Sequence, residues 1–289
     1  MNAPAPQPMH CGAWRTLWRC LRLLEHVLTG VLILGFVSLI SRDGARPAWL
    51  PALVQWWYRR ECRALGVRVE VSGVLASGCL LVSNHISWLD VTVLGAQAPL
   101  GFLSKSEVRG WPLIGWMSGV VDTLFIERGA NQVGPVTAEI GARIARGVSL
   151  VIFPEGTTSE GAGVGRFYPR LFSIALQPGL GVQPVAVSYR FVDRPAPDRS
   201  IAFVGDQTLI ANLWGVLRHP GLVARVQFLE PIHPGPGDDR RSLSGQARSA
   251  ILVALGQPET AGLGGRVPPR PGVRPGRRRS PGSAKQQSE

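Results

Sequence analysis

Apolar residues follow three different patterns along this chain. Between residues 18 and 40 most positions are apolar, and residues 27–40 carry no charge. From residue 67 to residue 255, short apolar runs alternate with longer segments in which apolar positions recur at helical spacing. Beyond residue 255 no apolar period remains, and Pro, Gly, Ser and Arg dominate. These patterns predict an N-terminal hydrophobic helix, a domain of strands and helices, and a disordered tail.

In the central region the short apolar runs predict strands and the periodic segments predict helices. The predicted strands are residues 67–71, 79–83, 101–104, 123–126, 149–153, 184–189, 201–204 and 224–229. The predicted helices are residues 87–97, 107–119, 132–146, 170–177, 209–218 and 240–255. Strands that alternate with helices are typical of an α/β fold with a mostly parallel or mixed sheet flanked by helices. We therefore expect an unstructured start (1–16), anchoring and interfacial helices (17–66), an α/β domain (67–255) and a disordered basic tail (256–289).

The hydrophobic segment is close to the lower limit for crossing a membrane. As an α-helix, residues 27–40 would rise about 21 Å, short of the ~30 Å hydrocarbon core, and residues 23–26 extend the run only slightly. Arginines stand on both sides, so charge does not fix an orientation. Residues 48–65 have the spacing of an amphipathic helix, and the aromatic and basic residues at 56–60 suit a membrane interface. The first segment is therefore predicted to be a single span or a helix that lies in one leaflet, and a core helix of a soluble domain is the alternative.

Composition narrows the class of partner. The chain has 289 residues and a net charge of +12, which favours anionic partners such as acidic lipid headgroups, phosphorylated substrates or nucleic acid. Only 17% of residues are charged and the mean hydropathy is +0.12, which favours contact with a membrane. No nucleic-acid-binding motif is present. The four cysteines form no C-x-x-C pair, so we expect reduced thiols in a cytoplasmic compartment and no metal site.

Two polar segments directly follow apolar runs. Residues 84–90 read NHISWLD after CLLV, and residues 153–159 read FPEGTTS at the end of SLVIF. Each is expected at the carboxyl end of a buried strand, where open α/β sheets bind ligands. On one helix, His85 and Asp90 would point about 140° apart. A capping box with Ser87 at the N-cap and Asp90 three residues later would bring them together.

This pair has two interpretations. His85 is a candidate general base and Asp90 its orienting carboxylate. Alternatively, Asp90 only caps a helix and His85 is a loop residue with satisfied hydrogen bonds.

Four segments in the same order resemble the motifs of the glycerolipid acyltransferase family, which includes 1-acyl-sn-glycerol-3-phosphate and other lysophospholipid acyltransferases. NHISWLD resembles the first motif, N-H-x-S-x-x-D, and TLFIERG at 123–129 resembles the second. FPEGTTS resembles the third and QPVAV at 183–187 the fourth, and the linking stretch at 102–119 is also similar. The similarity covers roughly residues 65–230.

The resemblance implies a membrane-bound O-acyltransferase. Such an enzyme transfers an acyl group from acyl-CoA or acyl-carrier protein to the hydroxyl of a lysolipid, with His85 as base and Asp90 as its partner. It needs no metal and no tightly bound cofactor. Backbone N–H groups near Ser87 are candidate oxyanion donors. We expect a bacterial-type inner membrane location with the active site at the cytoplasmic face. The rival from another class is a non-catalytic basic protein that binds membrane or nucleic acid.

The same resemblance assigns acceptor contacts to the second and third motifs. Arg128 follows the second-motif strand, and Glu155, Gly156 and Thr157 form the third-motif turn; Lys105 is a further anion contact. One position departs from the family pattern: Thr158 stands where lysophosphatidate enzymes commonly have arginine. A lost charge-assisted contact is worth ~1.5–3 kcal/mol. The departure therefore favours another lysolipid, such as lyso-ornithine lipid, as an alternative acceptor.

Overall fold

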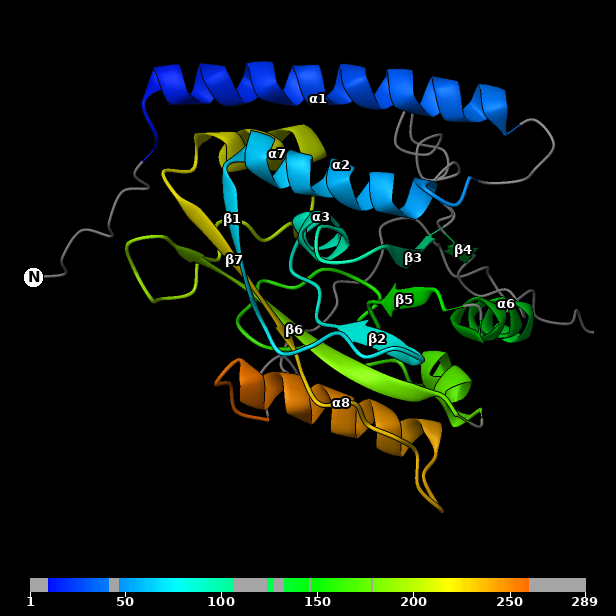
Figure 1. The fold of residues 1–289 in the computed structure, drawn as a ribbon. Helices are drawn as coiled ribbons and strands as arrows, with labels where there is room; N and C mark the ends of the chain where they lie inside the picture. The colour runs from blue at the N-terminus through cyan, green and yellow to red at the C-terminus, as the bar shows by residue number, and fades with distance from the viewer. Residues whose placement is uncertain are drawn as a thin grey trace, which may run out of the picture.

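A computed structural model describes residues 10–41, 47–105, 124–126, 133–145, 147–177 and 179–259. A twisted sheet lies between two layers of helices, and a long helix covers one of these layers (Figure 1). The seven strands are β1 (Val67–Ser72), β2 (Cys79–Ser83), β3 (Leu100–Lys105), β4 (Leu124–Ile126), β5 (Ser149–Ile152), β6 (Gly181–Phe191) and β7 (Leu222–Phe228). The α/β fold predicted from the alternating pattern is confirmed.

The strand order is β1-β7-β6-β2-β5-β3-β4. Strand β2 pairs in parallel with β5 and β6, and β3 pairs in parallel with β5 and β4. Strand β7 runs antiparallel to β6, and β1 is parallel to β7. The carboxyl ends of β2, β3, β4 and β5 therefore meet at one edge of the sheet, where α/β folds bind their ligands.

Alternating side chains divide the core between the two faces of the sheet. On β2, Leu81 belongs to the cluster formed with α2 (Leu50–Leu65), α3 (Leu89–Gly95) and α7 (Leu209–Arg218). Its neighbours Leu80 and Val82 belong to the opposite cluster. That cluster is formed with α6 (Val133–Ala145), the 3-10 helix η1 (Pro169–Leu176) and α8 (Arg240–Ala254). Because β2 is buried on both faces, its sequence is a continuous apolar run rather than an alternation.

Helix α1 (Ala13–Ile40) is the one described helix that is long and apolar enough to cross a membrane. It lies along α2 and α7 (Figure 1), with only 22% of its most apolar stretch buried. Arg19 donates to the carbonyls of Leu217 (3.0 Å) and His219 (2.7 Å), so the helix is bonded to the end of α7. Because α1 begins at Ala13, the unstructured start predicted for residues 1–16 is too long.

The structure confirms some of the predicted elements and corrects others. Residues 79–83 and 209–218 form a strand and a helix with the predicted bounds. Residues 201–204 do not form a strand, because Phe203 donates its N–H to Ile86 of a loop instead of joining the sheet. Residues 170–177 correspond to a 3-10 helix that begins at Pro169. The helix predicted at 107–119 lies outside the described residues. All four cysteines are free thiols, as predicted.

Candidate active site

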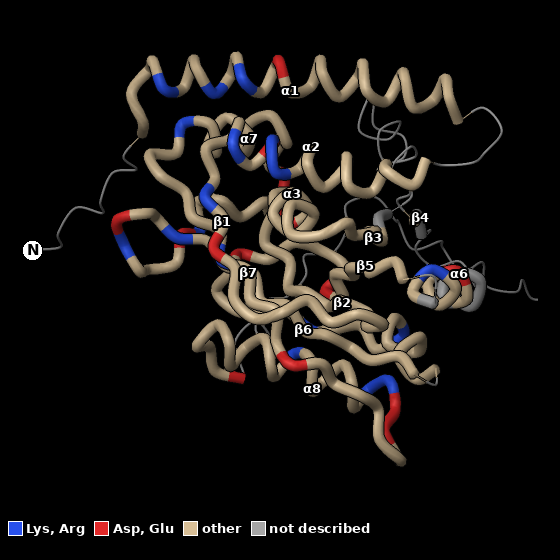
Figure 2. The backbone as a smooth tube through the Cα atoms, in the orientation of Figure 1, with Lys and Arg blue, Asp and Glu red and all other residues tan. Residues whose placement is uncertain are grey.

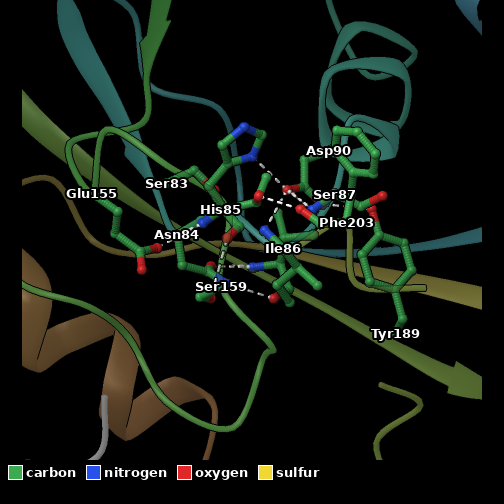
Figure 3. A network of polar contacts seen from close by, with 12 residues as sticks. Ser83, Asn84, His85, Ile86, Ser87, Asp90, Glu155, Ser159, Tyr189 and Phe203 are labelled. Carbon is green, nitrogen blue, oxygen red and sulfur yellow. Dashed lines mark hydrogen bonds and ion pairs between the residues drawn. The ribbon is translucent and has the colours of Figure 1, made fainter. Parts of the chain in front are cut away.

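The loop after β2 holds His85 at the ligand-binding edge of the sheet. The Asn84 side chain fixes this loop to β6: its amide donates to the Val187 carbonyl (2.9 Å) and accepts from the Val187 N–H (2.8 Å). The His85 carbonyl accepts hydrogen bonds from the N–H and hydroxyl of Ser159 in the third motif. The first and third motifs therefore share one hydrogen-bonded loop structure (Figure 3).

The structure brings His85 and Asp90 together. His85 Nδ1 lies 2.8 Å from Asp90 Oδ2, and the carboxylate is fully buried. The same oxygen accepts the backbone N–H groups of Ile86 (2.7 Å) and Ser87 (2.9 Å). The imidazole stacks on the Phe153 ring at 4.0 Å, and 19% of the His85 side chain is exposed. Within the described part of the chain, Nε2 has no hydrogen-bond partner.

Ser87 does not cap the helix as predicted. Helix α3 begins at Leu89, and the Asp90 N–H donates to the Ser87 backbone carbonyl (3.1 Å), not to the hydroxyl. The Ser87 hydroxyl is buried without a partner among the described residues. Only the acidic half of the capping box forms, in which the Asp90 carboxylate accepts the Ser87 N–H. A turn still brings the pair together, but it is closed by backbone atoms.

The predicted oxyanion donors are also corrected at three positions. The N–H groups of Ile86 and Ser87 both donate to Asp90, and the His85 N–H donates to Glu155. An amide N–H provides a single donor, so these three groups are occupied.

Glu155 supports the loop that carries His85. Its Oε1 accepts the His85 N–H (2.8 Å) and its Oε2 accepts the Gly165 N–H (2.8 Å). Burial raises the pKa of Glu155 to about 7, although the two backbone donors act in the opposite direction. The contacts in the structure are therefore positioning contacts, and the acceptor-binding role of Glu155 stays a prediction. Gly156 has φ 68°, which favours glycine in this turn.

Three comparisons place this geometry among known proteins. A protein-family model described as Acyltransferase matches residues 67–188. The lyso-ornithine lipid O-acyltransferase of Pseudomonas aeruginosa is 43% identical over 83% of this chain and 93% of that protein. The chain belongs to the acyltransferase family. The 1-acyl-sn-glycerol-3-phosphate acyltransferase of Neisseria meningitidis is 30% identical over 62% of this chain and 70% of its own length.

The fold of this acyltransferase is also found in a solved structure. The 1-acyl-sn-glycerophosphate acyltransferase PlsC of Thermotoga maritima superposes with a TM-score of 0.62. The alignment covers 84% of this chain and 94% of that chain at 20% identity. Together with the named relatives, it confirms the resemblance stated from the four motifs.

Tyr189 is a hydrogen-bond partner of Asp90 in this acyltransferase, and none of the four motifs contains it. Its hydroxyl donates to Asp90 Oδ1 at 2.6 Å, and both groups are buried (Figure 3). Burial and the adjacent carboxylate raise the pKa of Tyr189 well above its ordinary value, so it remains a donor. A period of two along β6 contains the signal, because Val185, Val187 and Tyr189 all join the cluster on the α3 face.

The structure describes only some of the remaining residues that were predicted to bind the acceptor. Thr157 is exposed in the third-motif turn, whereas the hydroxyl of Thr158 donates to the Phe203 carbonyl. Lys105 ends β3 at the same edge of the sheet as His85. Arg128 lies outside the described residues. Among the described residues, no group of three or more His, Cys, Asp or Glu side chains is arranged to hold a metal ion.

Proposed function

We propose that this acyltransferase is a membrane-bound enzyme that moves an acyl group from acyl-CoA or acyl-carrier protein to the hydroxyl of a lysolipid. The observation that carries the proposal is the His85–Asp90 pair. One imidazole nitrogen is bonded to a buried carboxylate, and the other has no partner among the described residues. That is the arrangement a general base needs, because the carboxylate selects the tautomer and leaves Nε2 to accept a proton.

The reaction then needs no acylated side chain. His85 Nε2 takes the proton of the acceptor hydroxyl while its oxygen attacks the thioester carbonyl, and Asp90 stabilises the imidazolium. Collapse of the tetrahedral intermediate breaks the C–S bond, and the imidazolium returns its proton to the thiolate. The products are an ester and a free thiol. General-base catalysis of this kind contributes roughly 10²–10⁴-fold.

For the acceptor, we infer a lysolipid of the lyso-ornithine type rather than lysophosphatidate. The support is the 43% identity to an enzyme named for lyso-ornithine lipid and the threonine in the third motif. The Thr158 hydroxyl is bonded to Phe203, so this position supports the loop instead of offering a cation. The test is a panel of lysophosphatidate, lyso-ornithine lipid and two lysophospholipids with labelled acyl-CoA.

Two variants of Thr158 separate charge from loop support. Thr158→Arg adds a cation and should raise kcat/KM for lysophosphatidate relative to lyso-ornithine lipid by about tenfold if the new contact is partly desolvated. Thr158→Val removes the hydroxyl without adding charge and should leave that ratio unchanged. Efficient use of lysophosphatidate by the wild type, with a ratio unmoved by Thr158→Arg, would contradict the inferred acceptor.

We further infer that the enzyme attaches through α1 to a bacterial-type inner membrane, with its active site at the cytoplasmic face. Leu21, Leu28, Leu32 and Phe36 leave an exposed apolar row on α1, while its other side packs on α2 and α7. An exposed row on a helix that rests against its own domain favours a helix lying in one leaflet.

Membrane flotation tests this inference. The double variant Leu28→Glu/Leu32→Glu should move most of the enzyme to the soluble fraction. Val253→Glu is the matched control, because Val253 is an exposed apolar residue of α8, beyond the opposite face of the sheet. Full-length wild type in the soluble fraction without detergent would refute the membrane attachment.

A further inference from the structure

A cavity of about 150 Å³ lies beside the active-site loop, on the side of His85 that faces β6 and β7. Asn84 and Ile86, the two neighbours of His85 in the chain, line it. Its opposite wall includes Leu255 and Gln257, directly after α8. A ligand in this cavity would therefore lie against the loop that carries His85.

The cavity wall has an excess of positive charge. Arg190, Arg199 and Arg225 line it. Glu70 accepts two hydrogen bonds from Arg190 (2.8 and 3.0 Å) and lies 3.7 Å from Arg225. The acidic residue in the wall, Asp198, accepts hydrogen bonds from His219 and Ser200. Figure 2 shows basic positions gathered with a few acidic ones around the ends of β1, β6 and β7.

One of the arginines that line the cavity has an unused hydrogen-bond donor. Arg190 Nε is buried and has no hydrogen-bond partner among the residues that the structure describes. Half of the Arg225 side chain is exposed, at 51%. Guanidinium groups bind phosphate oxygens through paired N–H donors, so the wall has the chemistry of a phosphate site.

We propose that this cavity binds the phosphate of the acyl donor's phosphopantetheine arm, which acyl-CoA and acyl-carrier protein share. The inference rests on the proposed function. Strand β2 lies between β6 and β5, and the cavity lies toward β6 and β7. The loop after the third motif also reaches the cavity, through Gly161 and Gly163. The arm would carry the thioester from the cavity past this loop to the imidazole of His85.

The test compares Arg225→Gln with Arg68→Gln. Both arginines lie near Glu70, at 3.7 and 3.9 Å, and both are exposed, but only Arg225 lines the cavity. Arg225→Gln should raise KM for the acyl donor roughly fivefold and leave kcat and the acceptor KM unchanged. Arg68→Gln should change none of these values. Arg199 lies in an exposed loop, and Arg199→Gln should also raise KM for the acyl donor. This second variant tests the site if Arg225→Gln folds poorly.

Direct binding separates this proposal from the proposed function. CoA and holo-acyl-carrier protein are titrated against the full-length enzyme and both cavity variants. Weaker binding in Arg225→Gln and Arg199→Gln than in Arg68→Gln supports the site, even if no acyl transfer is observed. An increase confined to the acceptor KM would show that the cavity holds the acceptor headgroup and would overturn the proposal. Equal binding by all variants would overturn it as well.

Discussion

The described residues of this acyltransferase form two His–Asp pairs, which differ in the hydrogen bonding of the second imidazole nitrogen. His85 Nδ1 lies 2.8 Å from Asp90, and His219 Nε2 lies 2.7 Å from Asp198. His219 Nδ1 also accepts the N–H of Gly221 (3.1 Å), whereas His85 Nε2 has no partner within the described part of the chain. Both nitrogens of His219 are occupied, so this ring cannot accept a proton without losing a hydrogen bond.

The two histidine rings also differ in their exposure to solvent. The His219 ring is almost completely buried beside Phe191, at the end of α7. The His85 ring lies at the sheet edge, partly exposed and stacked on Phe153. A short His–Asp distance therefore does not identify a catalytic pair. The free nitrogen and its access to solvent make the distinction.

Alanine at each histidine gives the largest expected contrast. His85→Ala should lower kcat by at least ~10²-fold and leave the melting temperature nearly unchanged. His219→Ala should cost about 3 kcal/mol in the free energy of unfolding, because it leaves the buried Asp198 carboxylate without its partner. Turnover of the folded fraction should stay close to wild type. The measurements are kcat with saturating substrates and thermal unfolding of both variants. A reversal of the two effects would break the comparison.

Asparagine at each carboxylate tests charge with little change of shape. In Asp90→Asn, an amide oxygen at the Oδ2 position can keep three hydrogen bonds, and the amide NH2 can donate to the Tyr189 hydroxyl, which reverses the direction of the fourth. We expect turnover to fall by roughly 10²–10⁴-fold, because an amide cannot stabilise the imidazolium. Asp198→Asn should keep turnover and lose about 1–3 kcal/mol of stability. Turnover near wild type in Asp90→Asn would reduce Asp90 to a structural residue.

Tyr189→Phe sharpens the assignment of Asp90 by removing one donor. We expect kcat to fall about tenfold with unchanged KM for both substrates, since one charge-assisted hydrogen bond is lost. Tyr58→Phe provides the control, because Tyr58 packs against α3 through its ring and belongs to the same apolar cluster. An equal loss of stability in both variants, with no change of kcat in either, would leave Tyr189 as a packing residue.

The smallest expected effect is on the dependence of stability on pH. The pKa of Glu155 is about 7 in the folded protein and 4.5 ordinarily, so the folded state binds the proton more tightly. Stability should therefore fall as pH rises from about 5 to about 7, by up to about 3 kcal/mol. Burial also raises the pKa of Glu61 to about 7, so Glu61 should contribute to the same fall in stability. In Glu155→Gln the decline should be smaller, as chemical denaturation at each pH would show.

Asp198 should contribute nothing to this decline. Burial would raise the pKa of Asp198, but hydrogen bonds from His219 and Ser200 outweigh it and lower the pKa below 3.8. Its contribution to stability is present above the ordinary value and is lost only as pH falls through the lowered one. An equal decline in wild type and Glu155→Gln would show that Glu155 does not titrate in this window.

Local patterns were sufficient to predict strand β2 and the approach of His85 to Asp90. Strand β2 and the polar loop after it follow from a buried apolar run that ends in residues unsuited to a strand. His85 and Asp90 are five residues apart, so a single predicted turn was enough to bring them together. The family motifs then supplied the chemistry that one histidine and one aspartate leave open.

Contacts between distant residues could not be predicted in the same way. Tyr189 and Asp90 are 99 residues apart, and no short motif links them. Residues 201–204 have the composition of a strand, but packing against the active-site loop decides their structure. Asp198 and His219 lie in segments without a recognised motif. In each case the tertiary structure, not the local sequence, determines the partner.

The hydrogen bonds of Arg19 have a consequence for how the chain is made. Its acceptors, the carbonyls of Leu217 and His219, lie 198 and 200 residues further along the chain. During synthesis α1 leaves the ribosome before α7, and most of the α/β domain must be translated before these bonds can form. Helix α1 is therefore made before α7 but is among the last elements to reach its final contacts. If α1 enters a lipid interface, as proposed above, the domain completes its folding against a helix that the membrane already holds.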